Sequence, residues 1–146
     1  MRTNLATELL YDENFKYCED YELWTRVAEL AKVATLPDYL LSHRVHDKKG
    51  IGLNHKIVKQ NTVTLLSREL DKIQVEHTPE ELMLHAAVCF GIAPVLFKNK
   101  EQQIAINQWL DRVFSSKVLT QRYDKKRLLD FRKNILKTSS PLICGL

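Results

Sequence analysis

Glycine is scarce in this chain, which has four glycines among its 146 residues. Two of them stand in the short run GIG at residues 50–52, where no strand, turn and helix are predicted in succession. A phosphate-binding loop needs its glycines in that setting, because the backbone must approach the phosphate closely. The sequence therefore contains no loop that is typical of a nucleotide-phosphate site.

Cysteine is also rare, and Cys18, Cys89 and Cys144 lie far apart in the sequence. None belongs to a CxxC pair or has the spacing to histidine that is typical of a zinc site. An odd number of scattered cysteines predicts neither a disulfide framework nor a zinc centre. Reduced thiols, as in a cytoplasmic protein, are the expectation.

Long apolar runs are missing as well. The most apolar stretch, residues 82–97, is interrupted by His85, Gly91 and Pro94 and is too short to span a bilayer. The first ten residues lack the apolar core of a secretory signal. We therefore expect a cytoplasmic protein that can lie against the inner face of the membrane. Within it, residues 82–97 should form a buried helix with a break.

The composition is that of a globular protein with a basic surface. Apolar residues make up 45% and charged residues 27% of the chain, with a net charge of +4. Basic residues gather between positions 121 and 137, namely Arg122, Lys125, Lys126, Arg127, Arg132, Lys133 and Lys137. A solvated helix face is the simpler interpretation, and binding to an anionic lipid surface is an alternative. No ladder of aromatic residues indicates nucleic-acid binding.

Hydrophobic periodicity predicts a mainly α-helical fold with two domains, residues 1–48 and 49–146. In the first, Asp20 is expected to cap a helix with Glu22 in its first turn. Residues 33–46 are expected to form a short extended or β segment.

The second domain is expected to be a small antiparallel helical bundle. Asn54 should precede a long helix, and Thr78, Pro79 and Glu81 should open another. Further helices are expected over residues 101–116 and 119–137. The apolar stripe of the long helix comprises Val58, Leu65, Leu66, Leu70 and Ile73.

Two groups of side chains are candidates for a site. Glu19 and Asp20 are most simply the start of a helix, but a carboxylate fixed there is also well placed to act as a general base. In the extended segment, alternation puts Arg44 and His46 on one face and His43 on the other. A guanidinium suits phosphate and an imidazole suits a metal, although a single histidine is no metal site.

Residues 11–46, YDENFKYCEDYELWTRVAELAKVATLPDYLLSHRVH, resemble the C-terminal part of the catalytic domain of family 2 glycosyltransferases, which are inverting enzymes of GT-A fold. The resemblance rests on the order of an aspartate-bearing loop with Phe15, the Glu-Asp pair, the Leu-Trp-x-Arg helix and an Arg-x-His ending. The Met-Arg segment and short helix before residue 11 are similar too. The resemblance covers about the first third of the chain.

The resemblance implies roles for four residues. Asp20 would be the catalytic base on an acceptor hydroxyl, and Glu19 would shape the acceptor site. His46 would help to bind a divalent metal, Mg or Mn, on the donor diphosphate, with Arg44 nearby. Trp24 is interpreted instead as a packing residue. Arg26 is interpreted as the partner of an ion pair with Glu22, which lies four residues earlier.

The chain also departs from the family pattern, because it has no Asp-x-Asp motif and no sequence for a nucleotide-binding sheet before the Glu-Asp pair. We therefore expect a truncated remnant of a GT-A domain that is inactive alone and binds no metal by itself. The full-length enzyme would use a nucleotide-sugar and a glycan or lipid-linked acceptor in polysaccharide or glycoconjugate synthesis. A helical interaction or dimerisation module without catalysis is the alternative, and self-association is expected in either case.

Overall fold

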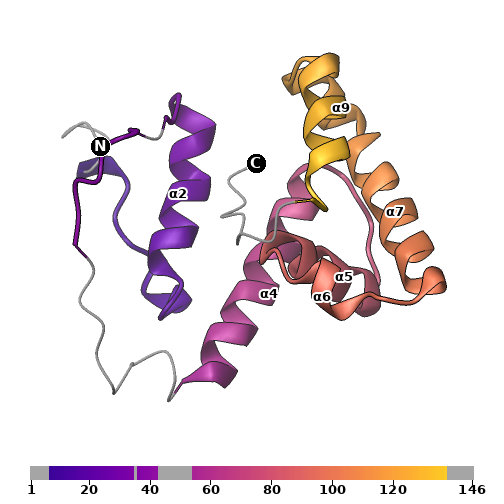
Figure 1. Ribbon diagram of the computed structural model, residues 1–146. Helices are drawn as coiled ribbons and strands as arrows, with labels where there is room; N and C mark the ends of the chain where they lie inside the picture. Colours follow the sequence, from indigo (N-terminus) through magenta and orange to yellow (C-terminus); the bar gives the residue numbers. More distant parts are fainter. Residues whose placement is uncertain (1–6, 35, 43–53, 138–146) are drawn as a thin grey trace. The chain divides into compact units, whose positions relative to one another are not determined.

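The computed structural model describes residues 7–34, 36–42 and 54–137 (Figure 1). Its elements are the 3-10 helix η1 (Glu13–Phe15) and the α-helices α2 (Glu19–Leu30), α4 (His55–Lys72), α5 (Pro79–Cys89), α6 (Ala93–Leu96), α7 (Lys100–Phe114), α8 (Lys117–Arg122) and α9 (Lys125–Asn134). The predicted mainly α fold is confirmed. No strand forms at residues 33, 34 or 36–42, and the rest of the predicted extended segment lies outside the described residues.

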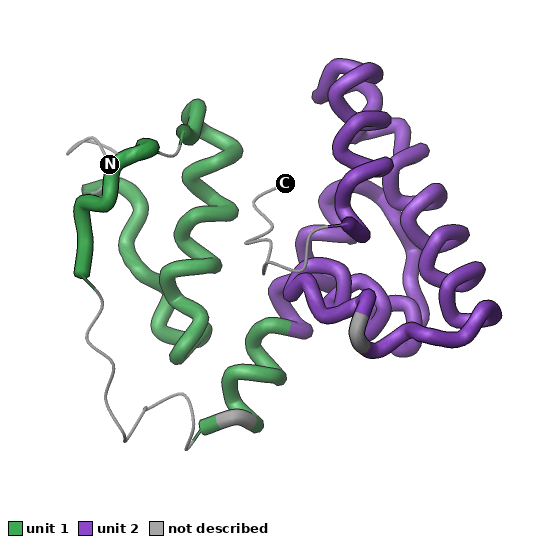
Figure 2. The backbone as a smooth tube through the Cα atoms, in the orientation of Figure 1, with its two compact units in different colours: residues 1–62, 145–146 green, residues 63–144 purple. Residues whose placement is uncertain are grey.

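The chain divides into two compact units, residues 1–62 with 145–146 and residues 63–144 (Figure 2). The division falls within α4. The domain boundary predicted between residues 48 and 49 lies outside the described residues and stays a prediction. No helix in the described part of the chain is long and apolar enough to cross a bilayer.

In the first unit, α2 packs beside η1 and buries Leu23 and Val27 together with Cys18. The Cys18 thiol lies 3.3 Å from the Thr62 hydroxyl and 3.7 Å from the Val58 carbonyl of α4. The Asn61 amide donates to the carbonyl of Lys16 at 2.9 Å. These contacts fix the loop before α2 against the first part of α4.

In the second unit, α5 packs against α7, and α7 packs against α9. The predicted stripe of α4 is confirmed from Leu65 to Ile73, and Ile106, Leu110 and Val113 of α7 are buried as their spacing predicts. The core also includes Trp109. The capping box at Thr78 is present, since its hydroxyl accepts from the Glu81 N–H while the Glu81 carboxylate accepts from the Thr78 N–H.

Two predicted helical segments are each divided into two helices, one as expected and one not. The break predicted within residues 82–97 is confirmed, since α5 ends at Cys89 and α6 begins at Ala93; the structure places it around Gly91, which has φ 65°. The single helix predicted over residues 119–137 is wrong, because α8 ends at Arg122 and α9 begins after Asp124. Asp124 accepts from the Arg127 N–H at 3.0 Å, so its side chain favours the start of a new helix over continuation of the old one.

Candidate functional site

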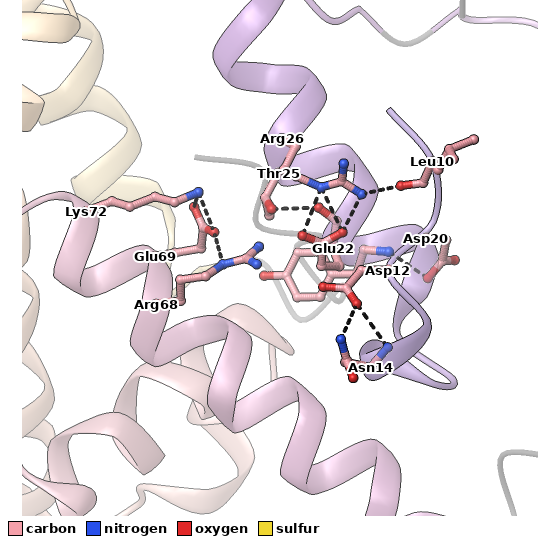
Figure 3. A network of polar contacts seen from close by, with 11 residues as sticks. Leu10, Asp12, Asn14, Asp20, Glu22, Thr25, Arg26, Arg68, Glu69 and Lys72 are labelled. Carbon is pink, nitrogen blue, oxygen red and sulfur yellow. Dashed lines mark hydrogen bonds and ion pairs between the residues drawn. The ribbon is translucent and has the colours of Figure 1, made fainter. Parts of the chain in front are cut away.

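The loop before α2 is shaped by local hydrogen bonds. The Asp12 carboxylate caps η1 by accepting a hydrogen bond from the backbone N–H of Asn14 at 3.0 Å and another from the side-chain amide of Asn14 at 2.8 Å (Figure 3). Tyr17 has φ 67°, in the left-handed region that is costly for a residue with a β-carbon. The Cys18 N–H then donates to the Phe15 carbonyl at 2.8 Å. The chain therefore turns sharply just before the acidic pair.

Helix α2 begins differently from the prediction. Cys18 occupies the N-cap position without a capping side-chain bond, so the prediction of Asp20 as the cap is wrong. Asp20 lies inside the first turn, where its Oδ1 accepts from the Tyr21 N–H at 2.7 Å. Burial of the Cys18 thiol against α4 fixes which residue precedes the helix. Glu19 and Asp20 both remain exposed to solvent.

An open hollow of about 680 Å³ lies at this end of α2. Its lining residues come from the loop and the first turn of the helix: Tyr11, Asp12, Glu13, Lys16, Tyr17, Glu19 and Asp20. Four carboxylates and two phenol rings thus surround one ammonium group. Negative charge is tolerated here in part because the exposed backbone N–H groups of a helix N-terminus carry partial positive charge.

Within α2, an ion pair joins the buried Glu22 to the partly exposed Arg26. Glu22 is 1% exposed, and the Arg26 Nε donates to both of its carboxylate oxygens at 3.0 and 2.9 Å. A second guanidinium nitrogen donates to Glu22 at 2.8 Å and to the Leu10 carbonyl at 2.7 Å (Figure 3). The predicted pair of Arg26 with Glu22 is confirmed. Since Glu22 follows Asp20 by two residues, its side chain leaves the helix on the side away from that of Asp20.

The pKa of the Cys18 thiol is raised, chiefly by burial and further by the negative charges of Asp20 and Glu19, against a lowering by its hydrogen bond with Thr62. A thiol with a raised pKa forms little of the nucleophilic thiolate at neutral pH. Cys18 is therefore a packing residue next to the hollow and not a nucleophile. Cys89, in the second unit, is buried as well.

The structure describes two of the four predicted site residues. Glu19 and Asp20 line the same hollow, whereas Arg44 and His46 lie outside the described residues. Within the described ranges, no three His, Cys, Asp or Glu side chains are placed to hold a metal ion. Residue-by-residue reasoning missed Tyr11, Lys16 and Tyr17, although all three stand within nine residues of the pair and could have been found by that proximity.

A second hollow, of about 560 Å³, lies in the other unit next to the α4–α5 connection. Its polar groups are already engaged with one another: Arg112 donates to the Glu81 carboxylate at 2.6 Å and to the Glu76 carbonyl at 2.9 Å. The His77 Nε2 lies 2.9 Å from the Ser67 hydroxyl. These contacts join neighbouring elements, so this hollow is the weaker candidate for a site.

Comparison with known proteins supports a relationship to a glycosyltransferase. No protein-family model matches the chain, and no solved structure matches it. The chain is 30% identical over 84 residues to an uncharacterized glycosyltransferase of Haemophilus influenzae. The match covers 52% of this chain and 25% of that protein. The chain therefore spans about a quarter of the length of this relative.

Proposed function

We propose that this chain is the C-terminal part of an inverting glycosyltransferase of family 2 type and GT-A fold. The enzyme would transfer a sugar from a nucleotide-sugar to an acceptor hydroxyl, in the synthesis of a cell-surface polysaccharide or glycoconjugate. The observation that carries the proposal is the exposed Glu19 and Asp20 pair beside an open hollow, in the segment that resembles this family. The glycosyltransferase relative supports the general class of reaction.

In the proposed reaction, Asp20 removes the proton from the acceptor hydroxyl. The acceptor oxygen forms a bond to the anomeric carbon while the bond from that carbon to the diphosphate oxygen breaks, and the nucleoside diphosphate leaves with the electron pair. A general base must lie within hydrogen-bond reach of the proton that it takes. One Asp20 oxygen accepts from the Tyr21 N–H, which fixes the carboxylate at the helix start and leaves its other oxygen for the acceptor.

The hollow itself favours a certain acceptor chemistry. Carboxylates accept hydrogen bonds from hydroxyl groups, and the rings of Tyr11 and Tyr17 offer apolar surface for a sugar ring. Because the hollow has four carboxylates against Lys16 alone, a phosphate or carboxylate close to the reacting hydroxyl would be repelled. We therefore propose a polyhydroxylated acceptor that is neutral or cationic near the reacting group, and we assign Glu19 to its positioning.

The donor diphosphate would be held by other groups. We propose that Arg44 contacts it and that His46 helps to bind the divalent metal, Mg or Mn, of the full-length enzyme. Such a metal would neutralise charge on the leaving diphosphate. The described residues provide no group of three metal ligands, so no step above is assigned to the metal.

We further propose that the chain does not transfer sugar alone. It spans about a quarter of its glycosyltransferase relative. In the first unit, apolar side chains at the end of α2 and after it are exposed, namely Leu30, Val33, Leu36, Tyr39, Leu40 and Leu41. Exposed apolar surface of this extent is typical of a face that another part of a protein covers. In the full-length enzyme, the nucleotide-binding sheet would cover these apolar side chains.

The same exposed side chains also favour the second candidate function, a helical interaction or dimerisation module without catalysis. In that case these side chains would be covered by a second copy of the chain. Catalysis would then be absent from every form of the protein, whereas the proposed enzyme would gain activity when the preceding coding region is restored.

The test of the proposed function compares two forms of the protein. The chain alone should release no nucleoside diphosphate from nucleotide-sugars. The polypeptide extended by the in-frame coding region upstream should do so when an acceptor is supplied, and Asp20→Asn should lower its rate by about 100-fold or more, since general base catalysis contributes about 10²–10⁴. Turnover by the chain alone would overturn the dependence on further sequence.

The matched control is Asp130→Asn, which neutralises an exposed carboxylate outside the hollow and outside the exposed apolar side chains of the first unit. It should leave the rate of the extended enzyme unchanged. Undiminished activity of Asp20→Asn in the extended enzyme would remove Asp20 as the base.

A further inference from the structure

One face of α9 is fixed to the rest of the second unit. Leu128 and Ile135 are buried, and the Phe131 ring lies 5.9 Å from the Phe114 ring of α7. The Arg132 guanidinium donates to Asp111 at 2.9 Å and to the Asn107 side chain at 2.9 Å, both on α7. Figure 1 shows α9 alongside α7. These contacts determine which side chains of α9 point outward.

The outward face of α9 combines lysines with one apolar residue. Lys125, Leu129 and Lys133 follow one another at intervals of four residues, and Lys126 lies beside them, so the four share one side of the helix. All four are exposed, and Leu129 is 52% exposed. No ion pair engages these lysines within the described residues. We call these four residues the α9 outer face.

The surroundings of the α9 outer face extend its positive charge. Arg122 at the end of α8 and Arg127 in the first turn of α9 are also exposed, and Tyr123 between the two helices is 38% exposed. The opposing carboxylates are Asp124, which caps α9, and Asp130. Arg132 is already neutralised by Asp111 and does not contribute. Five cations thus face two carboxylates.

We propose that the α9 outer face binds the surface of an anionic lipid bilayer. Lysine ammonium groups attract the negative headgroup layer, and an exposed leucine between them can enter the boundary between headgroups and acyl chains. Tyr123 is of the type that lies at such an interface. A nucleic-acid surface is less well matched, because the lysines surround an aliphatic side chain and not a row of aromatic rings. This inference goes beyond the proposed glycosyl transfer and does not depend on it.

Sedimentation of the full chain with vesicles tests the inference. At low ionic strength the chain should bind phosphatidylcholine vesicles that contain about 30% phosphatidylserine, and not vesicles of phosphatidylcholine alone. Since each lysine near the surface contributes about a fivefold gain in binding, the triple variant Lys125→Gln, Lys126→Gln, Lys133→Gln should lose about 100-fold in partition coefficient. Raising the salt concentration should weaken binding of the original chain.

Two matched controls isolate the α9 outer face. The triple variant Lys56→Gln, Lys59→Gln, Lys98→Gln has the same net charge change at other exposed positions and should retain most of the binding. Leu129→Ser should lower binding severalfold, whereas Ile104→Ser, at a side chain of α7 that is 50% exposed, should not.

Equal binding to both kinds of vesicle, or equal loss in both triple variants, would overturn the proposal. So would binding of a short single-stranded RNA that requires Lys125, Lys126 and Lys133 while the chain fails to bind the anionic vesicles.

Discussion

At the scale of single residues, the Glu22 carboxylate is stable in its buried position because Arg26 supplies a bidentate partner. The same hydrogen bond raises the pKa of Arg26 above its usual value. A further bond from Arg26 to the Leu10 carbonyl ties the segment before the hollow to α2. The pair therefore supports the position of the hollow without taking part in its chemistry.

Replacement of Arg26 by methionine should destabilise α2. The variant removes the guanidinium that offsets the desolvation of Glu22, and the free energy of unfolding should fall by about 2 kcal/mol. This is less than for a fully buried pair, because Arg26 is partly exposed. Hydrogen exchange of the α2 amides should become about 30-fold faster. Lys32→Met, at an exposed position two residues beyond α2, serves as the control and should leave exchange unchanged. Unchanged exchange in Arg26→Met would show that the pair contributes little to stability.

His85 is the second residue whose environment has a measurable consequence. It is 7% exposed, its Nδ1 has no hydrogen-bond partner, and its ring meets Trp109 edge-on at 5.9 Å. Burial lowers its pKa from 6.5 to about 4, with a smaller contribution from the charge of His77. The folded protein therefore holds His85 in its neutral form well below the pH at which the unfolded chain is protonated.

The pH dependence of stability follows from this difference. Between about pH 6.5 and about pH 4 the unfolded state binds a proton that folded His85 does not, so the free energy of unfolding falls as the pH is lowered through this range. The free energy of unfolding of the original chain and of His85→Leu should be compared at about pH 7.5 and about pH 4.5. On going to the lower pH, the original chain should lose about 2–3 kcal/mol more than the variant. Urea unfolding followed by tryptophan fluorescence measures this loss. Identical losses in both proteins would contradict the prediction.

At the scale of elements, two helices of the second unit end in the same way. After α4, the Val75 N–H donates to the Leu70 carbonyl and the Gln74 N–H donates to the Asp71 carbonyl. After α5, the Ile92 N–H donates to the Ala87 carbonyl and the Gly91 N–H to the Val88 carbonyl. Both are Schellman endings, which require a left-handed residue. Gly91 has φ 65° and Gln74 has φ 57°. Glycine adopts this conformation without strain and glutamine does not.

Gln74→Gly should therefore stabilise the second unit by about 0.5 kcal/mol, after the entropy that glycine adds to the unfolded chain is subtracted. The control is the same substitution in a helix, Gln121→Gly in α8, which should destabilise by about 1 kcal/mol. Thermal or urea unfolding measures both. If Gln74→Gly lost as much stability as the control, the side chain of Gln74 would stabilise the fold by more than its left-handed backbone conformation destabilises it.

At the scale of the whole molecule, the exposed apolar side chains of residues 30–41 predict self-association of the chain. Their transfer from water into a contact is favourable, by roughly 25 cal/mol per Å². Sedimentation velocity should show a mass that rises with protein concentration, and Leu40→Ser with Leu41→Ser should shift the protein toward the monomer. Ile104→Ser with Met83→Ser, at exposed apolar positions of the second unit, should not. A strict monomer at every concentration would contradict this prediction.

Sequence alone determined the helical class, the α4 stripe from Leu65 to Ile73, the Thr78 capping box, a break within residues 82–97 and the Glu22–Arg26 pair, because each depends on residues within a few positions of one another. The tertiary structure decided what depends on distant contacts. Burial of Cys18 against Thr62 made Cys18, and not Asp20, the residue before α2. Folding of the loop brought Tyr11 and Lys16 to the acidic pair, and packing of α9 on α7 selected which of its cations face outward. Such outcomes follow from the burial of surface between elements, which no local pattern specifies.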